Sequence, residues 1–260
     1  MTIEGRTESA ANIAARAHMT KQEFVASPYV LTGWTKLTSP HTPVNVYIEG
    51  DGLAWLSKSE PSGNPTPKKP VALTLAVQDP SPNVVYLARP CQYTPFDRLG
   101  NHCQTLDWTS HRFSHSTVES YQQVLDQIKE EVGSNGFNLI GYSGGGNIAG
   151  LLTSRRRDIL SLRTVAGNVD NKAFTEFHEV SSMPESLNMA DVVEQIASVP
   201  QVHFVGERDP IIPQSLAEGL KQKAPLQNCI QIQVVKGNTH VDGWEENWPR
   251  LLDSPFVCLP

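Results

Sequence analysis

The sequence lacks any apolar run approaching the roughly 20 residues that a membrane-spanning helix needs. It also lacks a basic excess, because 21 lysines and arginines stand against 27 aspartates and glutamates, giving a formal net charge of −6. Nucleic acids and anionic membrane surfaces bind to basic patches. The sequence therefore predicts neither a nucleic-acid partner nor a membrane span, and its 39% of hydrophobic residues is typical of a globular protein.

Internal repeats and low-complexity tracts are absent as well, apart from a proline-rich stretch at 61–70 that is typical of a surface loop. At 260 residues the chain is long enough for one large domain, and we expect a single domain over 1–260 with an N-terminal extension at 1–22. This extension has no apolar core like that of a secretory signal. The sequence as it stands predicts a cytoplasmic protein, whereas removal of an upstream signal would place it in the cell envelope or periplasm.

Cysteine is scarce, with four residues at positions 91, 103, 229 and 258. If all four are oxidised, three pairings are possible. Cys91 and Cys103 flank a short loop that a disulfide could close, but free cysteines are also ordinary core residues. Both alternatives stay open, because the redox compartment decides between them.

Alternating strands and helices make up the rest of the chain. Most of the β-rich runs are apolar without strict alternation, as expected for parallel strands covered on both faces; they lie at 29–37, 44–48, 83–88, 137–142, 162–166, 201–205 and 230–235. Helices are predicted at 71–77, 144–154, 187–197 and 214–223, and from Ser116, with Glu119 completing a capping box, to Gly133. This order predicts an α/β fold with a mostly parallel, doubly wound sheet and helices on both faces. In such sheets the reactive groups gather beyond the carboxyl ends of the strands.

A candidate nucleophile follows the run FNLIGY, where Gly141-Tyr142-Ser143-Gly144-Gly145 forms a G-x-S-x-G motif leading into a helix. The small residues are needed because such a serine lies on a tight strand-to-helix turn, where larger side chains would collide with neighbouring backbone. Because a serine hydroxyl is a poor nucleophile by itself, the motif requires a base and an orienting acid elsewhere.

Both partners are present in the chain order that this motif requires. Asp209 follows the penultimate predicted strand, in the turn GERDPIIP, and His240 follows the last one, in KGNTH. A second carboxylate, Asp170, follows the preceding strand and is the alternative acid. We favour Asp209, because Pro210 and Pro213 stiffen its turn.

An oxyanion intermediate needs backbone N–H donors that are in place before the reaction. Gly144, directly after the nucleophile, provides one. The segment Glu49-Gly50-Asp51-Gly52 follows an earlier strand, and we expect the N–H of Asp51 to be the second donor. An ordinary β-turn is the alternative interpretation of this segment.

These residues together resemble an α/β-hydrolase from about Val44 to about Trp244. The resemblance implies a mostly parallel eight-stranded sheet with helices on both faces and a small lid region. The segments YIEGDGLAW, YLARPCQY, GYSGGG and VGERDPIIP are similar to a group of bacterial α/β-hydrolases of unassigned substrate. Some members of that group look like exported lipoproteins, which favours an oxidised Cys91–Cys103 pair. Near the histidine, at 239–243, this chain lacks cysteines that its relatives carry, so the resemblance supports no second disulfide there.

Two other patterns in the sequence suggest different chemistry. Gly144–Ala149 matches a dinucleotide-binding G-x-G-x-x-A pattern, with Asp170 as the ribose-binding acid, but that reading leaves Ser143, Asp209 and His240 unexplained. His111 and His115 have a zinc-like spacing but lack a third ligand and a glutamate base. We therefore expect no metal site.

The sequence thus predicts a serine hydrolase that acts on a small-molecule acyl substrate, a carboxylesterase in the first instance, without metal or organic cofactor. Trp55, Tyr142 and Trp244 flank the proposed catalytic loops and are the candidate lining of the substrate pocket. Residues 171–199 are expected to form a small lid. A non-catalytic binding protein on a hydrolase scaffold is the alternative of a different class.

Overall fold

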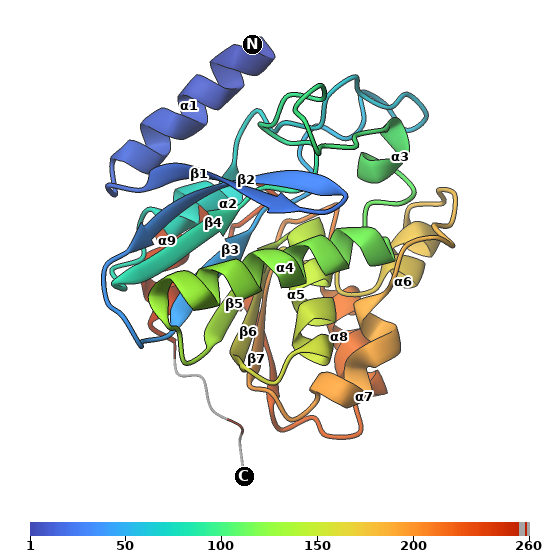
Figure 1. Ribbon diagram of the computed structural model, residues 1–260. Coiled ribbons are helices and arrows are strands. Elements are labelled where there is room, and N and C mark those ends of the chain that lie inside the picture. The colour runs from blue at the N-terminus through green and yellow to red at the C-terminus, as the bar shows by residue number, and fades with distance from the viewer. Residues whose placement is uncertain (255–257, 259–260) are drawn as a thin grey trace.

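The computed structural model describes residues 1–254 and 258, and within them eight strands form one sheet in the order β1-β2-β4-β3-β5-β6-β7-β8 (Figure 1). The strands are β1 (Thr20–Ala26), β2 (Tyr29–Leu37), β3 (Val44–Ile48), β4 (Asn83–Leu87), β5 (Phe137–Tyr142), β6 (Ile159–Val165), β7 (Gln201–Gly206) and β8 (Ile230–Val235). β2 is antiparallel to both of its neighbours, and all other adjacent strands are parallel. The predicted mostly parallel eight-stranded sheet is confirmed.

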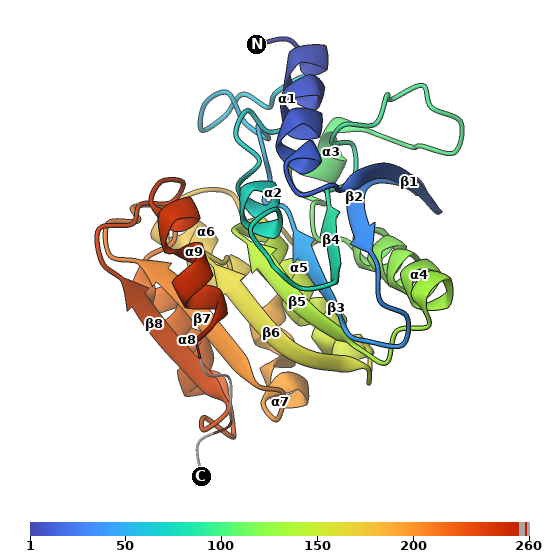
Figure 2. The ribbon, with the colours of Figure 1, turned by 90° about the vertical axis from the view of Figure 1, so that its left-hand side faces the viewer.

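Helices cover both faces of this sheet (Figure 2). One face carries α1 (Ile3–Ala15), α2 (Val71–Ala76) and α9 (Trp244–Leu252), and the other carries α4 (His115–Val132), α5 (Gly144–Arg155), α7 (Val193–Ile196) and α8 (Gln214–Lys223). Two short helices, α3 (Thr105–Trp108) and α6 (Asn171–Phe177), and the 3-10 helix η1 (Met189–Val192) lie in the connections. None of the described helices is long and apolar enough to span a bilayer.

The longest helix, α4, begins two residues earlier than predicted. Its N-cap is Ser114, whose hydroxyl accepts a hydrogen bond from the N–H of Thr117. Ser116 was the wrong choice because its hydroxyl bonds to that of Ser114 instead. The helix ends as predicted at Gly133, which adopts the left-handed conformation (φ 62°) that favours glycine at a C-cap.

The N-terminal residues 1–22, expected as an extension, pack against the rest of the fold. Ala10 and Ala14 of α1 are fully buried in the same hydrophobic cluster as α2, and β1 already begins at Thr20. The helix was not predicted because its buried face consists mainly of alanine, which gives little apolar contrast.

The segment 171–199 consists of two different parts. η1 and α7 replace the predicted continuous helix, and Met189 of η1 is fully buried against α5, where a side chain on Gly150 would overlap it. The hydrophobic core therefore includes the apolar side chains of this stretch, namely Met189, Ala190, Val193, Ile196 and Ala197. α6 and the loop after it also contact that core, through the partly buried side chains of Ala173, Phe174, Met183 and Leu187.

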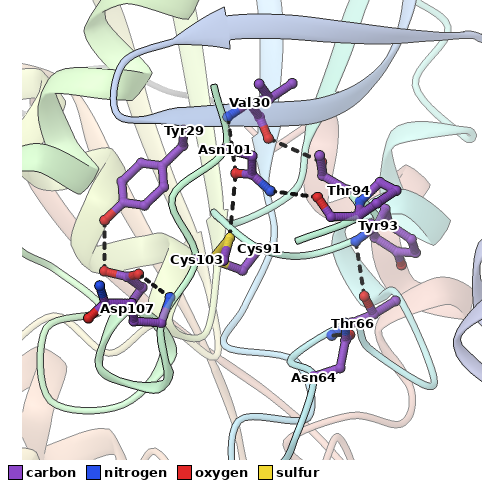
Figure 3. The surroundings of a disulfide bond; sticks show 12 residues. Tyr29, Val30, Asn64, Thr66, Cys91, Tyr93, Thr94, Asn101, Cys103 and Asp107 are labelled. Carbon is purple, nitrogen blue, oxygen red and sulfur yellow. Dashed lines mark hydrogen bonds between the residues drawn. A yellow bond between two sulfur atoms is a disulfide. The ribbon is translucent and has the colours of Figure 1, made fainter. Parts of the chain in front are cut away.

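Two disulfides are present, Cys91–Cys103 and Cys229–Cys258. The first closes the loop after β4, and Asn101 within this loop accepts the N–H of Val30 and so fastens the loop to β2 (Figure 3). The second joins the start of β8 to the C-terminal segment. Nothing in the sequence or in the resemblance pointed to this second pair.

Candidate active site

Ser143 occupies the turn between β5 and α5, at the carboxyl end of the sheet. Its backbone has φ 49° and ψ −121°, a conformation that non-glycine residues rarely adopt. Three hydrogen bonds hold it there: its N–H donates to Val165, and its carbonyl accepts from Gly146 and Asn168. Hydrogen bonds to β6 and to the loop after it therefore stabilise this strained conformation.

The glycines around Ser143 are required by close contacts. A Cβ on Gly141 would overlap the backbone of Gly145, and a Cβ on Gly145 would overlap the carbonyl oxygens of Ile48 and Glu49. This is the physical basis of the small residues in the G-x-S-x-G motif.

The structure brings Ser143, His240 and Asp209 together. His240 Nε2 lies 3.0 Å from Ser143 Oγ, and His240 Nδ1 lies 2.9 Å from Asp209 Oδ2. The other carboxylate oxygen of Asp209 accepts the N–H groups of Ile211 and Ile212 at 2.8 and 2.9 Å. The Asp209 side chain is fully buried, whereas that of His240 is 16% exposed. The arrangement can pass a proton from the serine to the imidazole and stabilise the resulting imidazolium.

The backbone of His240 is anchored by two aromatic residues. Its carbonyl accepts the hydroxyl of Tyr142 and the indole N–H of Trp244, both at 3.1 Å. Trp244 is fully buried and does not border the pocket, so its prediction as a pocket residue is wrong. Packing in the core and lining of a pocket select the same residue type, and sequence does not separate them.

The segment after β3 lies beside the nucleophile, because a Cβ on Gly50 would be 3.1 Å from the Cβ of Ser143. Gly50 is held from both sides: its N–H donates to Glu49 Oε1 (2.9 Å) and its carbonyl accepts Gln92 Nε2 (3.0 Å). By contrast, the N–H groups of Asp51 and Gly144 have no hydrogen-bond partner among the described residues. Two unpaired donors therefore lie near Ser143.

A pocket of about 650 Å³ opens over Ser143 and His240. Its lining is mainly apolar and includes Leu53, Trp55, Tyr142, Phe174, Ile211 and Val241. Trp55 and Tyr142 border this pocket, and Phe174 brings α6 to its edge. Two lysines, Lys68 and Lys69, lie on the same lining.

Glu49 is a buried acid that the sequence analysis did not single out as functional. It is 1% exposed, and burial raises its pKa to about 7, although hydrogen bonds from Gly50, Ala72 and Tyr86 partly oppose this. Arg89, Gln92 and Arg112 also contact the segment after β3 and were missed. They lie in distant parts of the sequence, so no motif spacing marks them.

The dinucleotide-binding and zinc-like patterns in the sequence find no support in these contacts. Asp170 is 2% exposed; it caps α6 and pairs with Lys223 at 2.5 Å, so it is not free to bind a ribose. His115 contacts Arg155 rather than His111, and no group of three potential ligands for a metal ion occurs in the described part of the chain.

Solved structures with a similar fold include several hydrolases. The esterase Pf2001 of Pyrococcus furiosus is 14% identical, with a TM-score of 0.62 and coverage of 90% of each chain. Est1E from Butyrivibrio proteoclasticus is 12% identical, with a TM-score of 0.62 over 89% of this chain and 95% of that one. The α/β hydrolase GrgF from Penicillium sp. sh18 is 14% identical, with a TM-score of 0.60 over 90% and 96%. These identities establish the α/β-hydrolase fold alone.

A search of curated proteins found no match. The sequence does match a protein family over residues 68–233, a range that contains Ser143 and Asp209 and ends before His240. This match covers more than half of the chain, and the family is described as serine hydrolase (FSH1). The chain therefore belongs to the FSH1 family of serine hydrolases.

Proposed function

We propose that the protein is a carboxylesterase that cleaves its substrate through an acyl-enzyme, with Ser143 as nucleophile, His240 as general base and Asp209 as the orienting acid. The observation that carries the proposal is the continuous hydrogen-bond chain from Ser143 Oγ through the imidazole to Asp209. Membership of a serine hydrolase family supports it.

In the proposed reaction His240 Nε2 takes the proton of Ser143 while Oγ attacks the ester carbonyl. The N–H groups of Asp51 and Gly144 stabilise the oxyanion, and His240 then gives the proton to the leaving alcohol. Water then attacks the acyl-enzyme by the same steps, with His240 again as general base, and the carboxylic acid is released. These steps need no metal or organic cofactor.

The proposed substrate is a small-molecule ester with an apolar group that fits the pocket beside Trp55 and Tyr142. A volume of about 650 Å³ accommodates a ligand of moderate size. Within the segment 171–199, α6 is the part we propose to act as a lid, because Phe174 borders the pocket.

Labelling with a fluorophosphonate tests the assignment. We expect modification of Ser143 and hydrolysis of p-nitrophenyl esters, with both lost in Ser143→Ala and retained in the control Ser154→Ala. Ser154 lies in α5, the helix that follows Ser143, and its hydroxyl donates to the Leu151 carbonyl. Equal labelling of the Ser143→Ala variant would move the nucleophile elsewhere. A wild-type protein that neither reacts with the probe nor cleaves any ester would support the non-catalytic binding protein instead.

A further inference from the structure

We propose that Arg89 and Arg112 are positioning residues for the oxyanion hole. In this proposal they fix the backbone of Asp51 and cancel the negative charge of its side chain. The inference rests on the proposed function, because it assumes that an oxyanion forms beside Gly144.

The contacts place two cations on one carboxylate. Arg89 Nη1 lies 2.9 Å from Asp51 Oδ1, and Arg112 Nε lies 3.0 Å from Asp51 Oδ2. The arginine side chains are 5% and 9% exposed, and that of Asp51 is 25% exposed. Arg89 Nη2 also donates to the carbonyl of Arg112, which links the two arginines to each other.

The Asp51 carboxylate would otherwise be unfavourable at this position. A Cβ on Gly144 would overlap Asp51 Oδ1, so this oxygen lies against the residue that offers the first oxyanion donor. The Asp51 carboxylate and an oxyanion bound at Gly144 would be two negative charges a few ångströms apart in a partly buried site, and they would repel each other strongly. With two guanidinium groups on one carboxylate, the cluster has a net charge of +1 and favours the oxyanion.

The arginines are held rigidly enough for this role. Both guanidinium groups lie over the ring of Phe113, at 5.0 and 5.3 Å from its centroid. The N–H of Arg89 donates to Gln92 Oε1, and Gln92 Nε2 in turn binds the carbonyl of Gly50. The disulfide of Cys91 closes the loop beside them. One short segment, 89–92, therefore fixes both Gly50 and Asp51.

The experiment compares Arg89→Met with Arg156→Met as a matched control. Arg156 is similarly buried (10% exposed), pairs with Asp126 and Asp158, and lies over the Phe137 ring, but it is outside the pocket lining. We expect Arg89→Met to lower kcat by about 10- to 100-fold with KM within about threefold, and to slow phosphonylation of Ser143 in parallel. Arg156→Met should lower thermal stability only, and Arg89→Lys should recover part of the lost kcat.

An Arg89→Met protein that folds and keeps the wild-type kcat and phosphonylation rate would overturn the proposal. If Arg89→Met does not fold, Arg89→Lys takes its place. Lysine keeps one positive charge but cannot reach both Asp51 and the Arg112 carbonyl, so a several-fold loss of kcat at unchanged KM is expected, and an unchanged kcat contradicts the proposal. Failure of the wild type to react at Ser143 would instead refute the proposed function.

Discussion

Three acidic residues follow three parallel strands of the same sheet, yet they meet different partners. Asp209, after β7, accepts two backbone N–H groups through one oxygen and the His240 imidazole through the other. Asp170, after β6, binds Lys223 and caps α6. Glu49, after β3, is buried without a cation among its hydrogen-bond partners.

A place at the carboxyl end of a strand does not by itself define a catalytic acid. The partner of the second carboxylate oxygen is what separates the three residues. An imidazole permits an orienting role for Asp209, and a lysine forms a structural ion pair with Asp170. The second oxygen of Glu49 accepts from the Tyr86 hydroxyl instead, which leaves an acid whose charged form is disfavoured by burial.

The largest expected effect comes from Asp209→Asn. We expect kcat to fall by about four orders of magnitude while the fold is retained, because the amide favours the wrong tautomer of His240. Steady-state kinetics on a p-nitrophenyl ester, with circular dichroism as the folding control, measures this. Asp170→Asn is the matched variant and should keep kcat within about threefold. The reverse ranking would assign the orienting role to Asp170.

The sequence predicted most of the elements that carry these acids, because apolar blocks bounded by turn residues mark buried strands well. β2, β3, β5 and β8 have the bounds expected from the pattern. Asp209 and His240 could be selected because each follows a strand. What could not be predicted depends on contacts between distant segments: Arg89 pairs with a residue 38 positions away, and α9 places Trp244 beneath His240 rather than in the pocket.

The second prediction concerns Glu49, whose pKa is raised by burial to about 7. Between its ordinary value of 4.5 and about 7, the folded protein holds a proton that the unfolded chain has lost. This group therefore lowers the free energy of unfolding as the pH rises through that window, by up to about 3 kcal/mol. Glu49→Gln removes the charge, so its stability relative to wild type should improve from pH 5 to pH 8.

Urea denaturation of both proteins at several pH values measures this difference. A constant offset between wild type and Glu49→Gln across the range would contradict the assignment of a raised pKa.

The smallest effect is expected for Asp170. Burial alone would raise the pKa of this carboxyl, but hydrogen bonds from Lys223, Asn188 and Ala173 outweigh burial and hold the pKa below its ordinary value. The folded protein thus favours the carboxylate, and the added stability is present above the unfolded pKa and is lost as the pH falls through the folded one. Lys223 is 52% exposed, so solvent screening limits the contribution to about 1 kcal/mol.

Asparagine can still cap α6, and Asp170→Asn should therefore be less stable than wild type by that amount at pH 7 and nearly equal to it at pH 3. Lys223→Met should follow the same course, since it removes the other half of the pair. If Asp170→Asn instead lost activity at unchanged stability, the distinction between a structural acid after β6 and an orienting acid after β7 would fail.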